Sequence, residues 1–260
     1  MTANTDRPIV ISILQYQDEI ETGSLSVFDL LDKVVALGVD GIELRREPWK
    51  SYQTEIAPVR ERLEAQGKFA TYATFSTLFA PDNDAYKLLL HDIDTAKALG
   101  SPLLRVFPGA APDDLSDPAW EAAKEAVQYA ALRGIVLALE NFGKMPGGTI
   151  REIAHILNAI PDPALQTNID IGNYATHGED VVAAIQAVGE RAIYAHLKDK
   201  LGSKSDATTY LGGGDMRMQE IMTALEALPQ RIIYCFEFAG GGEPDTRIEK
   251  SLAYLREFRP

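Results

Sequence analysis

The sequence predicts an α/β protein with a single domain, a (β/α)8 or TIM barrel that spans residues 1–260. Strand-like apolar runs alternate with helix-like amphipathic stretches along the whole chain, which indicates a parallel sheet. Eight such pairs fit a chain of 260 residues, because barrels of this type commonly contain about 250 residues. No Gly-x-Gly-x-x-Gly loop follows the first strand, and this disfavours an open dinucleotide-binding sheet.

The first four strand–helix pairs are marked by capping and helix-ending residues. Ser26 is a suitable N-cap for the first helix. Gly67, Gly100 and Gly134 end the next three helices. The predicted strands are Ile9–Tyr16, Gly41–Arg46, Phe69–Thr74 and Leu103–Phe107, and the predicted helices are Ser26–Leu37, Glu55–Gln66, Asn83–Leu99 and Pro118–Leu132.

The last four pairs repeat this order, and no linker divides the chain. A glycine-rich loop joins the seventh strand to its helix, whereas the other joints are short. The predicted strands are Ile135–Asn141, Leu165–Ile171, Ala192–Lys198 and Arg231–Phe238, and the predicted helices are Thr149–Ala159, Glu179–Val188, Met216–Leu228 and Asp245–Phe258.

Composition and charge narrow the class of protein. Hydrophobic residues make up 46% and charged residues 24%, as in ordinary globular proteins. A net charge of −13 argues against a nucleic-acid-binding surface. No signal segment and no apolar stretch of about 20 residues is present, so we expect no membrane association. The single cysteine, Cys235, excludes a disulfide within the chain and favours the cytoplasm. Both a monomer and a homo-oligomer are compatible with the sequence.

Four apolar runs in the second half end in, or are closely followed by, an ionisable residue. These residues are Glu140, Asp170, His196 and Glu237. Strand alternation places Glu140 on the inward face with Ala138, and the carboxyl ends of barrel strands meet at one mouth. Clustered carboxylates repel one another unless a cation or a proton compensates them. The pattern therefore predicts a metal site, and the competing interpretation is four separate solvent-exposed charges.

The predicted ligand set suits one divalent ion, such as Mn²⁺, Co²⁺, Zn²⁺ or Mg²⁺. Lys198 lies two positions beyond His196 and therefore on the same face, where it could hold an enolate or carboxylate oxygen. Further candidate substrate-binding residues are Glu43, Arg45, Arg105, Asn173 and His177. Each has a structural alternative, for example an ion pair between Glu43 and Arg45.

The strand ends carry motifs of a known superfamily. The motifs are Leu139-Glu140-Asn141, Asp170-Ile171-Gly172-Asn173, His196-Leu197-Lys198-Asp199, Phe236-Glu237, Gly41–Leu44 and Leu211–Asp215. Over nearly its whole length the chain resembles the xylose isomerase-like barrels. Their members include ketose 3-epimerases, sugar and hydroxypyruvate isomerases, inosose and dehydroshikimate dehydratases, and endonuclease IV.

The resemblance implies that Glu140, Asp170, His196 and Glu237 bind the metal ion. It also implies that the two glutamates act as an acid–base pair. Lys198 is a further candidate catalytic residue because of its position on the inward face beside His196. The leading hypothesis is a metal-dependent isomerase or epimerase that acts on a small ketose or hydroxy-ketone through an enediolate. The alternatives are a dehydratase of a cyclic keto-polyol or keto acid (inosose or dehydroshikimate type), and a non-catalytic barrel that binds a sugar or a partner chain. The expected partner of the enzyme is a small sugar or polyol substrate.

Two departures from family patterns restrict the choice. Asn173 stands where ketose 3-epimerases usually have a histidine, so the resemblance does not select a D-tagatose or D-psicose 3-epimerase. Endonuclease IV needs additional histidines for three metal ions. Of the four histidines here, His91 and His155 fall within predicted helices, so a DNA-repair nuclease is not expected.

Overall fold

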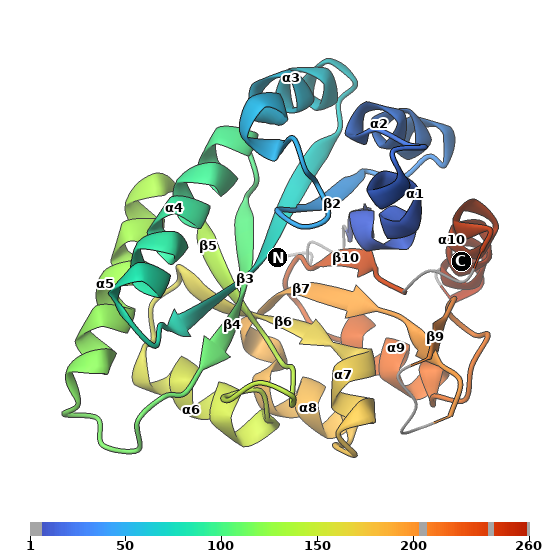
Figure 1. Cartoon of the computed structure of the whole chain (residues 1–260). Helices are drawn as coiled ribbons and strands as arrows, with labels where there is room; N and C mark the ends of the chain where they lie inside the picture. The colour runs from blue at the N-terminus through green and yellow to red at the C-terminus, as the bar shows by residue number, and fades with distance from the viewer. Residues whose placement is uncertain (1–6, 203–206, 239–241, 259–260) are drawn as a thin grey trace.

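Eight parallel strands form a closed barrel in the computed structural model, which describes residues 7–202, 207–238 and 242–258. The order around the barrel is β1-β10-β7-β6-β5-β4-β3-β2, and a ring of helices surrounds it (Figure 1). The barrel strands are β1 (Ile9–Ser12), β2 (Gly41–Arg45), β3 (Phe69–Phe79), β4 (Leu103–Gly109), β5 (Val136–Glu140), β6 (Leu165–Asp170), β7 (Ala192–Leu197) and β10 (Ile233–Phe236). The predicted barrel is thereby confirmed.

The helices that follow the strands also agree with the predicted pattern. They are α2 (Val27–Ala36), α3 (Tyr52–Ala65), α4 (Asn83–Leu99), α5 (Pro118–Arg133), α6 (Ile150–Ala159), α8 (Val181–Val188), α9 (Met218–Glu226) and α10 (Pro244–Phe258). Ser26 caps α2 as expected, since its side chain accepts a hydrogen bond from the Asp29 backbone N–H. None of the described helices is long and apolar enough to cross a membrane.

Short elements that were not predicted lie mainly at the carboxyl end of the barrel. The strand expected over Ile9–Tyr16 stops at Ser12, because the Ser12 side chain accepts a hydrogen bond from Leu14 N–H and starts a 3-10 turn over Ile13–Tyr16. The other additions are α1 (Gln17–Thr22), α7 (Ile171–Thr176), a 3-10 turn at Gly189–Arg191, and the antiparallel pair of β8 (Asp199–Lys200) and β9 (Thr208–Thr209).

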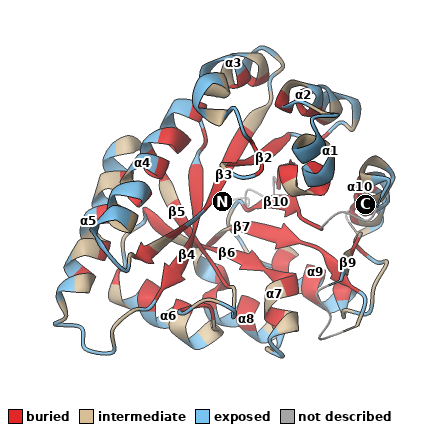
Figure 2. Ribbon diagram, in the orientation of Figure 1, coloured by how far each residue is buried: buried red, intermediate tan, exposed pale blue. Residues whose placement is uncertain are grey.

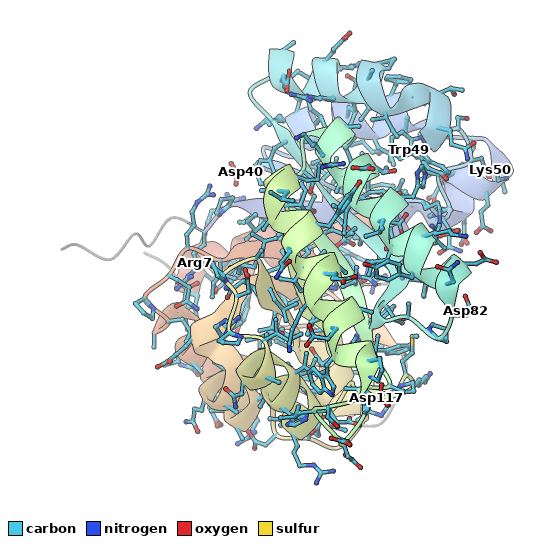
Figure 3. The ribbon with its side chains drawn as sticks, turned by 90° about the vertical axis from the view of Figure 1, so that its left-hand side faces the viewer. Arg7, Asp40, Trp49, Lys50, Asp82 and Asp117 are labelled. Atoms are coloured by element: carbon cyan, nitrogen blue, oxygen red, sulfur yellow. The ribbon has the colours of Figure 1, made fainter. Side chains whose placement is uncertain are left out.

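The two ends of the barrel are separated clearly in Figure 3. Arg7 and Asp40 precede strands and lie at one end. The labelled residues that follow β2, β3 and β4 lie at the other end; they are Trp49, Lys50, Asp82 and Asp117. Asp82 and Asp117 cap α4 and α5 at that end. This is the end that positions active sites in TIM barrels.

Apolar packing divides into two layers around the sheet, and Figure 2 shows strands that are almost entirely buried. Ala138 and Cys235 belong to the cluster inside the barrel. Leu137, Leu139 and Phe236 pack outward into the larger cluster between sheet and helices. The predicted alternation is confirmed, so the side chains of Glu140 and Glu237 are expected to point to the barrel interior.

Candidate metal centre and active site

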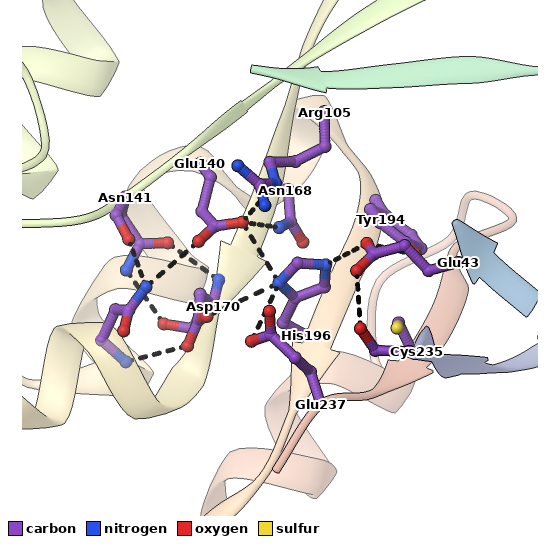
Figure 4. Close-up of polar contacts among 12 residues, drawn as sticks. Glu43, Arg105, Glu140, Asn141, Asn168, Asp170, Tyr194, His196, Cys235 and Glu237 are labelled. Carbon is purple, nitrogen blue, oxygen red and sulfur yellow. Dashed lines mark hydrogen bonds and ion pairs between the residues drawn. The ribbon is translucent and has the colours of Figure 1, made fainter. Parts of the chain in front are cut away.

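The four predicted ligand residues come from strands that are neighbours in the barrel. Glu140 ends β5, Asp170 ends β6, His196 lies near the end of β7, and Glu237 follows β10 directly. The strand register places Asp170 beside His196, and His196 beside Cys235. The structure therefore gathers these residues at one mouth, as Figure 4 shows.

Three carboxylates surround one nitrogen of the His196 ring. His196 Nδ1 lies 3.1 Å from Glu140 Oε2, 3.3 Å from Glu237 Oε2 and 3.6 Å from Asp170 Oδ2. His196 Nδ1 and Asp170 Oδ2 are both buried, and neither atom makes a hydrogen bond of acceptable geometry. An unpaired buried imidazole nitrogen beside three carboxylate oxygens fits the donor set of a divalent ion.

The other ring nitrogen of His196 fixes its orientation. Nε2 lies 2.7 Å from Glu43 Oε2, so a proton on Nε2 donates to Glu43. A metal ion would displace the second ring proton, and the Nδ1 lone pair would then face the three carboxylates. Glu43 also accepts hydrogen bonds from Ser12 Oγ at 3.0 Å and from the Tyr194 hydroxyl at 2.9 Å. Burial raises the pKa of Glu43, but Arg45 and His196 outweigh burial and hold this pKa below its ordinary value.

A second candidate ligand group shares His196. Among the described residues, two groups of three could each bind a metal ion, because one ligand atom from each member lies within 4.8 Å of the others. The first group contains Glu140, Asp170 and His196, and the second contains Glu43, His196 and Cys235. Burial and the Glu43 charge raise the pKa of the Cys235 thiol well above its ordinary value, which disfavours the thiolate that binds metals. The first group, together with Glu237, is the better metal centre.

Three cationic side chains compensate the carboxylates. Arg105 Nε lies 2.9 Å from Glu140 Oε2. Lys198 Nζ lies 2.7 Å from Asp170 Oδ2 and also contacts Glu237. Burial lowers the pKa of Lys198, but the charges of Asp170 and Glu237 outweigh burial and raise this pKa above its ordinary value.

Arg45 connects the metal centre to Glu43. Its Nε donates to Glu43 Oε1 at 2.9 Å, and its Nη2 donates to Glu237 Oε1. Burial raises the pKa of Glu237, but His196, Lys198 and Arg45 together hold this pKa well below its ordinary value. Glu237 is therefore a carboxylate at neutral pH.

Asparagine side chains complete the surroundings of the carboxylates. Asn173 Nδ2 donates to Glu140 Oε1 at 3.2 Å, and Asn168 Nδ2 donates to Glu140 Oε2 at 2.9 Å. Asn141 is bonded in both directions to the Asp170 backbone. The predictions missed Asn168, although it lies two residues before Asp170 and alternation places both on the inward face.

A cavity of about 240 Å³ opens above this cluster. Most of the predicted site residues line it: Arg45, Arg105, Glu140, Asn173, His177, Lys198 and Glu237. Glu43, Asp170 and His196 are fully buried and are not part of its wall. The volume is below the range of about 300–1,000 Å³ for drug-sized ligands and suits a small metabolite.

Aromatic rings form another part of the cavity wall. Phe107 lies between Phe75 and Phe142, with ring centroids 5.8 Å and 5.6 Å apart, and the His177 ring packs edge-on against Phe142. Phe75 is 56% exposed, which is unusual for so large an apolar side chain. Apolar surface at a cavity mouth is typical of ligand-binding sites.

A TIM barrel with a cluster of ionisable residues at the carboxyl ends of its strands has the architecture of a TIM-barrel enzyme. The family model described as xylose isomerase-like TIM barrel matches residues 31–258, and the chain belongs to this family. No curated protein sequence matches the chain.

Solved structures of several relatives share the fold at low sequence identity. The D-allulose 3-epimerase from Methylomonas sp., in complex with D-allulose, is 18% identical with a TM-score of 0.76, and 99% of each chain is covered. A D-tagatose 3-epimerase-like protein is 21% identical with a TM-score of 0.77 over 96% of each chain. The probable 3-DHS dehydratase from Bacillus anthracis is 15% identical with a TM-score of 0.77, covering 96% of this chain and 99% of the other.

Proposed function

We propose that this protein is a divalent-metal-dependent isomerase or epimerase of a small ketose or hydroxy-ketone. Glu140, Asp170, His196 and Glu237 would hold one ion, with Mn²⁺, Co²⁺, Zn²⁺ and Mg²⁺ as candidates. The observation that carries the proposal is the pair of glutamates beside the unpaired His196 Nδ1, at 3.1 and 3.3 Å. When bound, the ion would supply a Lewis acid that polarises a carbonyl group. The single cysteine supports a cytoplasmic location.

We assign proton transfer to the two glutamates. Burial raises the pKa of Glu140, but Arg105 and His196 outweigh burial and lower this pKa, so Glu140 and Glu237 both begin as carboxylate bases. One glutamate would remove the proton from the carbon next to the carbonyl group, at a carboxylate oxygen. Return of this proton to the neighbouring carbon, with transfer of a proton between the two enediol oxygens, isomerises the sugar. Epimerisation requires the other glutamate first to take up a proton from solvent and then to deliver it to the opposite face of the same carbon.

The remaining residues would bind the substrate or orient the residues that act on it. Lys198 lines the cavity, and its ammonium group would stabilise negative charge that develops on a substrate oxygen. Arg45 and Arg105 also line the cavity and would donate to substrate oxygens, while Asn173 would hold Glu140 in place. We assign Glu43 a positioning role, because it lies behind the His196 ring and outside the cavity wall.

A dehydratase is the alternative enzyme, and one relative is named a probable 3-DHS dehydratase. Loss of a hydroxyl group requires a general acid near the leaving oxygen. Because the neighbouring carboxylates raise the pKa of Lys198, this lysine is a poor acid. His177 at the cavity rim is the better candidate acid for that reaction. A barrel that binds a sugar without turnover is the remaining alternative.

Exchange with solvent deuterium tests the proposed reaction. We expect the Mn²⁺-loaded protein to incorporate deuterium at the carbon next to the carbonyl of at least one substrate among D-allulose, D-tagatose, L-ribulose and hydroxypyruvate. The measurement is ¹H NMR in D₂O, with metal-free protein as the control. Absence of exchange across this panel contradicts the proposal, and a new enone absorbance without an epimer product supports the dehydratase instead.

A further inference from the structure

Lys198 contacts the same two carboxylate oxygens that face the unpaired nitrogen of His196. Its Nζ lies 2.7 Å from Asp170 Oδ2 and also contacts Glu237 Oε2. These two oxygens lie 3.6 Å and 3.3 Å from His196 Nδ1 (Figure 4). An ion bound at His196 Nδ1 would therefore share two ligand oxygens with the ammonium group of Lys198.

The second oxygen of each of these carboxylates has a different partner. Asp170 Oδ1 accepts a hydrogen bond from the Asn173 backbone N–H at 2.8 Å. Glu237 Oε1 accepts a hydrogen bond from Arg45 Nη2. These two bonds orient the carboxylates, so that Asp170 Oδ2 and Glu237 Oε2 point toward the proposed metal centre.

Lys198 compensates Asp170 by charge rather than by a well-aligned hydrogen bond. Asp170 Oδ2 makes no hydrogen bond of acceptable geometry, although Lys198 Nζ is only 2.7 Å away. Because hydrogen bonds are directional, a contact of poor geometry holds the ammonium group less firmly than an aligned bond would. A divalent ion also attracts a carboxylate oxygen more strongly than a single positive charge does at the same distance.

Gly172 provides the space in which the Lys198 side chain lies. A Cβ atom at residue 172 would be 2.7 Å from Lys198 Cγ and 2.8 Å from Cδ and Cε. Gly172 belongs to α7, and its φ lies outside the left-handed region, so the backbone itself does not require glycine. Glycine is also less favourable than alanine within a helix. The contact with Lys198 therefore accounts for glycine at this position.

The Lys198 side chain has a second environment within reach. It lines the cavity of about 240 Å³ that lies above the carboxylates. The ammonium group of lysine is carried on a flexible stem of four carbon atoms. If it left Asp170 and Glu237, this group would therefore face the cavity, where a substrate would bind.

We infer that Lys198 and the metal ion compete for Asp170 Oδ2 and Glu237 Oε2, and that binding of the ion moves the Lys198 ammonium group from these oxygens to the cavity. This inference rests on the proposed function and adds an order of assembly to it. The ion binds first, and the ammonium group then becomes available to a substrate oxygen. Gly172 is a positioning residue, because it allows the Lys198 side chain to lie beside both carboxylates.

Removal of the competing charge tests this inference. Binding of Mn²⁺ to the chelator-treated, full-length protein is measured by isothermal titration calorimetry at one pH. We expect Lys198→Met to bind Mn²⁺ about tenfold more tightly than the unmodified protein, because one positive charge beside the ligand oxygens is lost. A lysine that only held the carboxylates in place would give the opposite result, weaker binding. Lys87→Met removes an exposed lysine that pairs with Asp84 on α4 and should change the affinity by less than about twofold.

Two further measurements keep the inference testable if Lys198→Met fails to fold. Gly172→Ala keeps the charge of Lys198 but displaces its side chain, and we expect about threefold tighter binding of Mn²⁺. A crystal structure of the Mn²⁺-loaded protein gives the position of the ammonium group directly. We expect Lys198 Nζ to lie more than about 3.5 Å from Asp170 Oδ2 in that structure, beyond hydrogen-bonding distance.

Unchanged or weaker Mn²⁺ binding by folded Lys198→Met protein would overturn the inference, and if that variant does not fold, the same result for Gly172→Ala would do so. A Mn²⁺-loaded structure in which Nζ keeps its 2.7 Å contact with Asp170 Oδ2 would also overturn it. Absence of Mn²⁺ binding in the unmodified protein and in both variants would reject the metal centre itself. Tighter binding by the variants, without deuterium exchange on any substrate, would reject the proposed reaction alone.

Discussion

Glu237→Gln is expected to lower the rate of deuterium exchange by about 10³-fold, because general acid–base groups contribute about 10²–10⁴-fold to catalysis. Glutamine keeps the shape of the side chain but cannot accept the substrate proton. It also removes a carboxylate oxygen 3.3 Å from His196 Nδ1 and weakens the proposed ligand set. The measurement is the initial rate of exchange by ¹H NMR at saturating Mn²⁺.

A matched control separates this effect from a general loss of charge. Glu220→Gln changes an exposed glutamate in the first turn of α9 that pairs with Arg217 at 3.0 Å and does not line the cavity. We expect its exchange rate to stay within about twofold of the unmodified protein, since surface pairs contribute little. If folded Glu237→Gln protein exchanged as fast as the control, Glu237 would have no role in proton transfer.

Arg45→Met is expected to destabilise the protein by about 3–5 kcal/mol, the usual effect of removing one partner of a buried ion pair. Arg45 donates to both Glu43 and Glu237, and all three side chains are nearly inaccessible to solvent. Without the guanidinium group, two carboxylates remain buried with less positive charge beside them. The measurement is urea unfolding of the metal-free protein, followed by circular dichroism.

Arg60→Met provides the comparison for Arg45→Met. Arg60 pairs with Glu64 at 2.7 Å on the exposed face of α3, and loss of such a pair changes stability by about 1 kcal/mol or less. Similar losses for both variants would show that the buried network does not depend on Arg45. Addition of Mn²⁺ is expected to restore part of the stability of Arg45→Met, because a bound cation compensates the same carboxylates.

The barrel could be predicted because local sequence signals determine most of it. Glycine stops and amphipathic stretches predicted α4 over Asn83–Leu99 with the bounds that the structure has. The errors arise where a side chain redirects the backbone or where the sheet continues past a local signal. Ser12 ends β1 early through its hydrogen bond to Leu14 N–H. β3 continues to Phe79 through a register shift that no residue pattern marks.

The position of the candidate site could be predicted for a related reason. Strand ends meet at one mouth in a barrel, so Glu140, Asp170, His196 and Glu237 could be grouped without knowledge of their distances. Their metal-binding role stays a prediction. Contacts between distant segments could not be predicted in the same way.

Glu43 and Lys200 illustrate this limit of sequence patterns. Glu43 contacts His196 across 153 residues, and alternation shows only that it points inward. Lys200 reaches the cavity because β8 pairs with β9, an interaction for which the sequence carried no recognised signal. Three-dimensional packing, rather than local pattern, decides what these side chains contact.

Titration of chelator-treated protein with Mn²⁺, followed by calorimetry, tests the metal centre most directly. We expect one ion per chain, loss of this binding in Asp170→Ala, and unchanged binding in Cys235→Ala, because Cys235 belongs only to the alternative ligand group. No saturable binding by the unmodified protein, or binding that survives Asp170→Ala and disappears in Cys235→Ala, would contradict the proposed ligand set.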